Sequence, residues 1–138
     1  MKIKTIWMAA LLLVVACQPS MAHPRVSPLP DLRIKKFLST PAAPQKLKVF
    51  VANSGRLGSA PCVLRLTVRK INGVSVGRTT EIPVPALAAG RAEWVSIDAA
   101  SILPKVIALN DTTFRLDIDP DDTVDEMNEK NNRAWYKL

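Results

Sequence analysis

The stretch CVLRLTVRKINGVSVGRTTEIPV, residues 62–84, decides the fold class of this 138-residue chain. An apolar residue stands at every second position from Leu64 to Val68, which is the period of a β-strand with one buried face. The pair Asn72-Gly73 follows, and both residue types tolerate the positive φ of a type I′ turn. The segment 74–82 is therefore predicted to return as the second strand of a hairpin.

The same alternation recurs on both sides of this hairpin, and turn residues such as Asn53-Ser54-Gly55 and Gly90 separate the apolar runs. The segment 98–109 fits either a short helical turn broken at Pro104 or an apolar loop over one edge, and is not expected to be a central strand. About seven short antiparallel strands at regular spacing predict an all-β, two-layer sandwich. The strands outside the hairpin are expected at about residues 32–34, 47–51, 93–97, 112–119 and 133–138.

The first residues are typical of an export signal. Two lysines within the first five residues precede an uncharged run, and Ser20-Met21-Ala22 forms a small-x-small cleavage site. We expect residues 1–22 to be a signal peptide rather than a membrane anchor, because a spanning helix needs about 20 apolar residues. Residues 14–17, VVAC, resemble the lipobox of bacterial lipoproteins. A cut before Cys17, with lipidation of that cysteine and a lipid-anchored association with the membrane, is an equal alternative.

The rest of the chain is expected to be one linker and one domain. Residues 23–30 are rich in proline and read as an extended linker, and residues 31–138 form a single sandwich domain. After either cut Cys62 is the only free thiol, so no intramolecular disulfide is expected to hold the domain. Because Cys62 begins an apolar run, we interpret it as a buried small side chain rather than a reactive thiol.

The charge of the chain is +7 and is unevenly distributed. Residues 23–110 hold thirteen Lys/Arg against four Asp/Glu, whereas residues 111–138 hold four against eight. Such a dipole steers a protein toward anionic surfaces such as lipopolysaccharide or phospholipid headgroups, although an ordinary solvated surface is the favoured interpretation. Nucleic acid is not expected as a partner, because an exported protein seldom meets it and the chain has no recognition motif.

An acidic segment is the strongest candidate for a site, because oxygen ligands at short spacing suit Ca²⁺. An EF-hand loop beginning at Asp117 fails, since Asp122 replaces the turn glycine and Asn128 replaces the bidentate glutamate. A calcium site of another kind is a candidate, and no other cofactor is expected. The favoured alternative is an acidic turn whose side chains bond to nearby backbone N–H groups. The candidate calcium ligands are Asp119, Asp121, Asp122, Asp125 and Glu126.

Catalytic groups are scarce in this sequence. His23 is the single histidine, so a histidine-based triad, an imidazole general base and a copper site built on two histidines are excluded by count. An acid pair of the glycosidase kind is disfavoured, because the acids share one turn rather than opposite walls of a cleft. The chain is therefore not expected to be an enzyme.

Trp94 and Trp135 are the candidate binding residues. Trp94 lies out of phase with Val95 and Ile97, and Trp135 lies between basic residues in the last strand. Exposed tryptophans stack on sugars or line protein interfaces. Burial, with the indole N–H reaching the edge of the sandwich, is commoner and is the favoured interpretation for each.

Several short stretches together give the chain a family resemblance. They resemble the CARDB family, the bacterial cell-adhesion-related domains, over nearly the whole mature chain. The resemblance implies an immunoglobulin-like β-sandwich with an extracytoplasmic role in binding or adhesion. The family is usually met as a repeat inside larger surface proteins, and a single free-standing copy departs from that habit. The stretches are PDLRI (30–34), VANSG (51–55), LAAG (87–90), DIDP (117–120) and VDEMNEKNN (124–132).

Two classes of function are compatible with these features. The first is a non-catalytic binding or adhesion module of a bacterial cell envelope, whose partner is a protein or an envelope polymer such as a glycan or a lipid surface. The alternative is a structural accessory subunit of an envelope assembly, motivated by the small solitary domain and its apolar edge strands. Either would act in the periplasm, anchored to the outer membrane or outside the cell. The sequence leaves the ligand and the oligomeric state open.

Overall fold

The computed structural model describes residues 28–40, 42–104 and 111–138, so the predicted signal peptide (1–22) and Cys17 lie outside the described residues. No helix in the described ranges is long and apolar enough to cross a membrane. The elements within these ranges are β1 (Leu32–Thr40), β2 (Ala43–Asn53), β3 (Cys62–Ile71), β4 (Val74–Val84), β5 (Ala92–Asp98), β6 (Thr113–Ile118), the short 3-10 helix η1 (Glu129–Asn131) and β7 (Arg133–Lys137).

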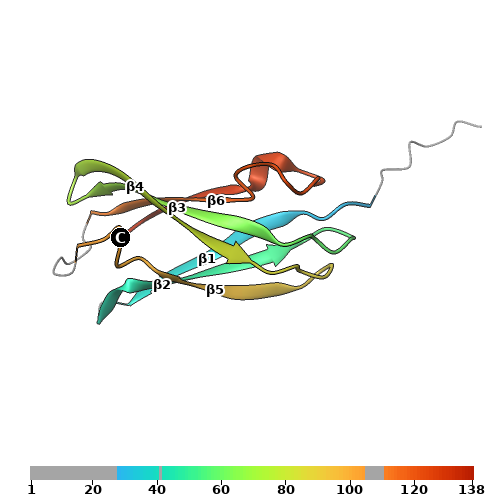
Figure 1. Ribbon diagram of the computed structural model, residues 1–138, viewed down its shortest axis with the longest axis horizontal. Helices are drawn as coiled ribbons and strands as arrows, with labels where there is room; N and C mark the ends of the chain where they lie inside the picture. The colour runs from blue at the N-terminus through green and yellow to red at the C-terminus, as the bar shows by residue number, and fades with distance from the viewer. Residues whose placement is uncertain (1–27, 41, 105–110) are drawn as a thin grey trace, which may run out of the picture.

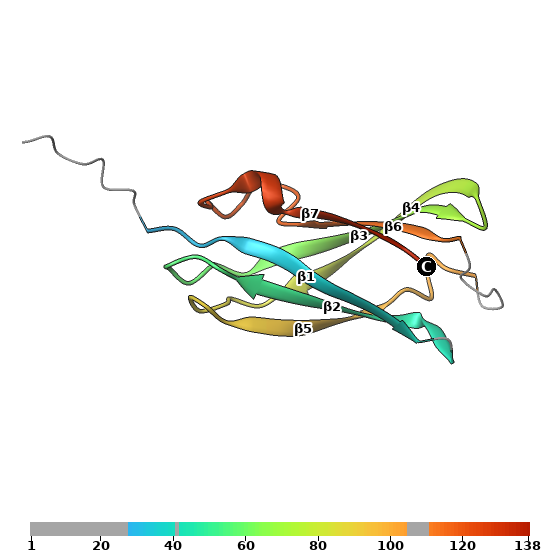
Figure 2. The same ribbon diagram turned by 180° about the vertical axis from the view of Figure 1, so that it is seen from behind.

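The strands form two sheets that pack face to face (Figures 1 and 2). One sheet has the order β1-β2-β5 and the other the order β4-β3-β6-β7, and every pairing is antiparallel. The chain passes from one sheet to the other between β2 and β3, between β4 and β5, and again between β5 and β6. This is an immunoglobulin-like β-sandwich, and the predicted all-β fold is confirmed.

The hairpin that decides the fold has the turn expected from its sequence. Asn72 and Gly73 have φ angles of +49° and +79°, and the register pairs Ile71 with Val74 on either side of them. The returning strand β4 continues past Pro83, beyond its predicted end. A proline is tolerated there because β4 is an edge strand and this residue has no ladder hydrogen bond to donate.

The core lies between the sheets and consists of aliphatic side chains around one aromatic ring. Phe114 is fully buried, and each buried Leu, Ile or Val contributes about 1.5–3 kcal/mol. Cys62 is a buried free thiol, as predicted, and burial raises its pKa to about 12. The described domain is therefore held by packing and hydrogen bonds. Its innermost residues are Leu32, Leu47, Val49, Val51, Leu64, Leu66, Val68, Ile97, Leu116 and Ile118.

The buried side-chain amide of one residue forms hydrogen bonds with several backbone groups at one end of the sandwich. Asn53, the last residue of β2, donates from Nδ2 to the carbonyl oxygens of Leu57 and Leu87 at 2.7 and 2.9 Å. Its Oδ1 accepts from the backbone N–H groups of Asp31 and Gly55, each at 3.0 Å. The predicted turn after β2 is thus fastened by one side chain with all four hydrogen bonds made.

The last residues of the predicted linker contact the domain. The carbonyl oxygen of Leu29 accepts from the N–H of Arg56, and that of Pro30 accepts from the N–H of Met127. A Cβ placed on Gly55 would lie 2.4 Å from the Leu29 oxygen, so only glycine leaves room for this approach. The hydrogen-bonded network therefore starts two residues before residue 31.

The segment after β5 begins as a buried turn. The N–H groups of Ile102 and Leu103 donate to the carbonyl oxygen of Ala99, and all three side chains are buried. The described part of this segment, up to Pro104, is not a strand, in agreement with the prediction, and residues 105–110 lie outside the described residues.

Candidate functional site

The outer face of the three-stranded sheet carries the most distinctive surface of the described residues. In β2 the side chains of Leu47, Val49 and Val51 fill the core. Because successive side chains of a strand point to opposite faces, Lys48 and Phe50 lie on the outer face.

The sheet register places side chains from three strands in rows across this face. Lys36 of β1 pairs with Phe50 of β2, which pairs with Trp94 of β5. In the adjacent row Leu38 pairs with Lys48. Neighbouring strands are about 4.7–4.9 Å apart, so the cationic and apolar side chains of these rows are immediate neighbours.

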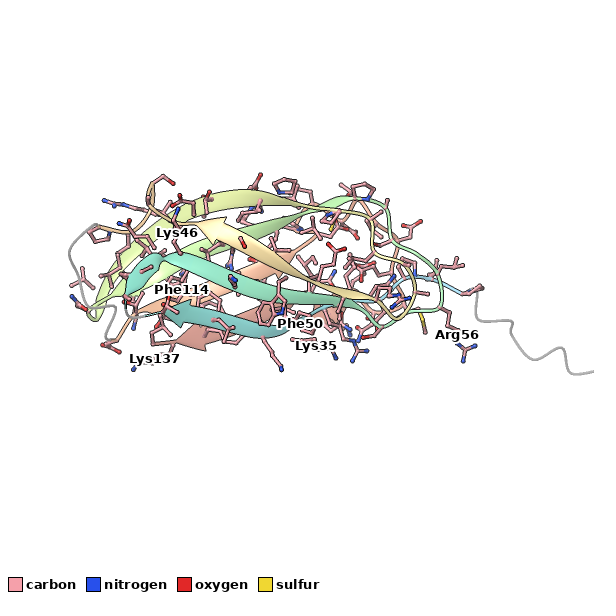
Figure 3. The ribbon with its side chains drawn as sticks, turned by 90° about the horizontal axis from the view of Figure 1, so that it is seen from below. Lys35, Lys46, Phe50, Arg56, Phe114 and Lys137 are labelled. Carbon is pink, nitrogen blue, oxygen red and sulfur yellow. The ribbon has the colours of Figure 1, made fainter. Side chains whose placement is uncertain are left out.

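A bulge in β1 adds a further cation to the same region. The register shifts between Ile34 and Lys36, and both Lys35 and Lys36 are exposed. Figure 3 looks onto this side of the molecule, with Phe50 on β2 and Lys35 beside it. We call the surface formed by the following residues the aromatic-cationic face: Lys35, Lys36, Leu38, Lys48, Phe50 and Trp94.

The aromatic part of this face is a contacting pair. The rings of Phe50 and Trp94 have centroids 4.8 Å apart and planes inclined by 39°. Trp94 is 44% exposed, so the predicted burial of this residue is wrong. The physical reason is the phase of β5: Val95 and Ile97 occupy the core, and alternation turns Trp94 outward at the edge of the sheet.

The lysines of the aromatic-cationic face have no acidic partner within ion-pair distance among the described residues. Among the described residues, none of the ion pairs involves Lys35, Lys36 or Lys48. All three are exposed. The face therefore presents uncompensated positive charge next to apolar rings.

Two cations at the ends of the same sheet are neutralised. Lys46 pairs with Asp98, and hydrogen bonding from Lys46 holds the pKa of that carboxyl below its usual value. Arg33 binds Asp31 at 2.6 Å. Burial would raise the pKa of Asp31, but the hydrogen bonds from Arg33 and Asn131 outweigh it and the pKa is lowered.

The outer face of the four-stranded sheet has a different electrostatic character. Arg65 binds Glu81 at 2.7 Å, and Asp117 accepts from Arg115 at 2.8 Å and from Arg133 at 2.5 Å. The carboxyl group of Asp117 is nearly fully covered by these contacts. Most of the positive charge of this face is thus balanced by acids on the same face.

Trp135 lies on this second face and is 55% exposed, so its predicted burial is also wrong. The neighbouring Tyr136 takes the inward position in β7 and stacks on Phe37, with ring centroids 5.0 Å apart. Trp135 pairs in register with Arg115, which is bound to Asp117. Trp94 and Trp135 therefore lie on opposite sheets and do not form one site.

The acidic turn is organised by its own hydrogen bonds. Asp119 is 5% exposed, and its two carboxylate oxygens accept from Thr123 Oγ1 at 2.5 Å and from the N–H of Val124 at 2.8 Å. Asp121 is exposed and accepts from Arg65 at 3.2 Å. Asp119 thus matches the structural interpretation of the acidic segment, in which side chains satisfy the backbone of a turn, whereas Asp121 bonds to a side chain instead.

The other predicted calcium ligands point to different environments. Asp122 and Asp125 are exposed, whereas Glu126 is 8% exposed and accepts from the N–H of Leu32 and from Asn132 Nδ2. Burial raises the pKa of Glu126 to about 7. Within the described ranges, no group of three or more His, Cys, Asp or Glu side chains is placed to hold a metal ion. The calcium site stays a prediction.

An open pocket of about 410 Å³ lies beside the acidic turn. Its lining mixes charges of both signs and holds neither histidine, cysteine nor serine. The pocket is lined by Asp117, Ile118, Asp119, Pro120, Asp122, Glu129, Lys130, Asn132 and Arg133.

The sequence prediction singled out Trp94 but missed its neighbours on the face. The local signal for Lys48 and Phe50 is their position out of phase with the apolar residues of β2. Their contact with Trp94 and with Lys36 depends on strand pairing between distant segments, which the local pattern does not encode.

Comparison with known proteins agrees with the fold. A model of the CARDB family matches residues 29–135. A domain of a protein described as a cell surface protein from Methanosarcina acetivorans, solved in solution, superposes with a TM-score of 0.61 at 22% identity, covering 80% of this chain and 90% of that chain. The crystal structure of the CARDB domain of a Pyrococcus furiosus protein in complex with di-metal ions superposes with a TM-score of 0.51 at 19% identity, covering 80% and 92%. No curated protein matches the chain.

Proposed function

The chain belongs to the CARDB family, and from this premise we propose that it is a non-catalytic, extracytoplasmic binding module of a bacterial cell envelope. The observation that carries the proposal is the aromatic-cationic face, where a half-exposed Trp94 and its partner Phe50 stand among lysines without acidic partners. Large apolar groups that remain exposed together on a small soluble domain commonly mark an interaction surface.

The remaining polar clusters support binding rather than catalysis. The acidic side chains Asp119 and Glu126 bond to backbone N–H groups of the turn and of β1, and Asp117 is bound by two arginines. These groups hold the fold together, and we infer that the outer face of the three-stranded sheet is the surface used by a partner.

An extracytoplasmic location is supported by the export pattern of residues 1–22. Mass spectrometry of the mature N-terminus tests it. Acyl chains on Cys17 would indicate a membrane tether, and a free His23 would indicate a soluble periplasmic or secreted protein. Recovery of the uncut chain from the cytoplasm would contradict the proposed location.

A binding experiment tests the role of the face. The mature protein is mixed with envelope fractions of the producing cells, and retention is measured for the unaltered chain and for Trp94→Ala. We expect Trp94→Ala to reduce retention at least tenfold while the melting temperature stays close to that of the unaltered protein.

Trp135→Ala is the matched control, because it removes another exposed tryptophan, from the opposite sheet. Equal loss in both variants, or no loss with Trp94→Ala, would contradict binding through the aromatic-cationic face. A stable stoichiometric complex with one envelope protein would instead favour the accessory-subunit function.

A further inference from the structure

We propose that the occupant of the aromatic-cationic face is an acidic polysaccharide, an inference that rests on the proposed binding function. Charge defines the first requirement on the partner. Lys36 and Lys48 are exposed, in adjacent rows and without acidic partners among the described residues. Asp98 of β5, an acid on this outer face, is already bound to Lys46. A partner that is electrostatically complementary to this surface must carry several negative charges.

The apolar groups define the second requirement. Phe50 and Trp94 lie in contact in the central and edge strands of the sheet, and Leu38 is 49% exposed in the next row. Aromatic rings at the surface offer flat apolar area with the indole N–H as a polar handle. The C–H face of a pyranose ring fits such a surface, while its hydroxyl groups and acid substituents reach donors at the ring edges.

Lysines and aromatic rings lie side by side on this face. This arrangement favours a polymer in which each unit carries both a negative charge and an apolar surface. In the row formed by Lys36, Phe50 and Trp94, the lysine lies one strand away from the Phe50 ring and two strands away from the Trp94 ring. A uronic acid or a sulfated sugar presents a carboxylate or sulfate and an apolar ring face within one residue, so successive sugars can use both kinds of group along the sheet.

The shape of the face disfavours a lipid bilayer as the occupant. Membrane-bound surfaces insert protruding apolar side chains below the headgroups. Here the Trp94 ring contacts Phe50 at an inclination of 39°, and Phe50 is itself partly buried. The two rings therefore pack against each other, and part of the apolar area of each is already covered.

The test uses the mature protein with three hexasaccharides: an alginate hexamer, a chondroitin sulfate hexamer and the neutral maltohexaose. Isothermal titration calorimetry is expected to show binding of at least one acidic hexamer. Its affinity should fall about tenfold between 50 and 500 mM NaCl, because the ion pairs are at the surface, and maltohexaose should bind at least tenfold more weakly.

Two double variants with equal charge change localise the site. Lys36→Gln/Lys48→Gln is expected to weaken the acidic hexamer about tenfold, and Trp94→Ala by a similar factor. Lys70→Gln/Lys130→Gln, which changes exposed lysines outside the face, is expected to change the affinity less than twofold. Equal losses in the two double variants would overturn the inference, because the binding would then depend on net charge alone.

The remaining outcomes separate this inference from the proposed function. If neither acidic hexamer binds at millimolar concentration while Trp94 still governs retention by envelope fractions, the acidic polysaccharide is overturned and the binding module stands. Binding only to vesicles containing phosphatidylglycerol would overturn it in favour of a lipid surface. If Trp94→Ala changes neither retention nor affinity, both proposals fail.

Discussion

The carboxylate of Glu126 accepts a hydrogen bond from the backbone N–H of Leu32, a residue 94 positions earlier in the chain. Its other oxygen accepts from Asn132 Nδ2 at 3.0 Å, and the group is nearly fully covered. One acidic side chain thus joins the start of β1 to the loop between β6 and β7.

This buried acid predicts a fall in stability between acidic and neutral pH. Burial raises the pKa of Glu126 from 4.5 to about 7, so the folded state holds the proton more tightly than the unfolded state. Its contribution to the free energy of unfolding is full below pH 4.5 and is lost as the pH rises through about 7. The loss amounts to at most about 3 kcal/mol. Urea unfolding from pH 4 to 8 measures it.

Glu126→Gln is the matched variant for this prediction, because it keeps an acceptor for the Leu32 N–H and removes the titration. We expect its stability to be flatter than that of the unaltered protein over the same range. Parallel pH profiles for the two proteins would show that Glu126 does not cause the dependence.

Asn53→Ala is expected to lower the free energy of unfolding by about 3 kcal/mol, because it leaves buried backbone groups without partners. The groups affected include the carbonyl oxygens of Leu57 and Leu87. Asn128→Ala is the control: its side chain is exposed and accepts one hydrogen bond, from the N–H of Lys130, so the loss should stay below about 1 kcal/mol. Equal chemical denaturation midpoints for Asn53→Ala and Asn128→Ala would contradict the larger contribution of Asn53 to stability.

Gly55→Ala tests the close approach of the chain before β1. The added Cβ would meet the backbone of residues 29–31 at 2.4 to 2.5 Å, and backbone cannot move aside as a flexible side chain would. We expect a loss of about 1–3 kcal/mol. In Gly58→Ala the nearest atom is 3.6 Å away, and the change should stay within about 0.5 kcal/mol. Thermal unfolding of both variants measures the difference. Equal melting temperatures would contradict the close approach at Gly55.

Added calcium is expected to leave the melting temperature unchanged. The carboxylate of Asp119 already accepts from Thr123 and Val124, and Glu126 accepts from Leu32 and Asn132. A site with a dissociation constant a hundredfold below the added concentration would stabilise the fold by about 2.7 kcal/mol. A rise of several degrees in 1 mM CaCl₂, abolished by EDTA, would therefore establish a calcium site in the acidic turn.

The strands were predictable where alternation is unbroken. From Leu64 to Val68 the period of two identifies both the strand and its buried face, and Asn72-Gly73 identifies the turn. The predicted first strand stops at Ile34, whereas β1 extends to Thr40. The bulge at Lys35 puts two consecutive lysines at the surface and shifts the alternation of buried and exposed residues by one position. The sequence pattern after the bulge therefore does not continue the pattern before it.

The candidate site was predictable only in part. The phase of β5 indicates that Trp94 points outward, but the general preference of tryptophan for burial suggested otherwise. The outcome depends on β5 being an edge strand, which is a property of the whole sheet. In the same way, Lys36 becomes a neighbour of Phe50 only through the pairing of β1 with β2.

The bond from Leu32 to Glu126, with that from Met127 to Pro30, also constrains when the domain can fold. A nascent chain that has emerged from the ribosome only as far as β6 does not yet contain Glu126 and Met127, the two partners of the start of β1. The sandwich can therefore be completed only after the segment that follows β6 has been synthesised. Contacts of such wide sequence separation slow folding. The start of β1 therefore stays without these two bonds until the last part of the chain has been synthesised.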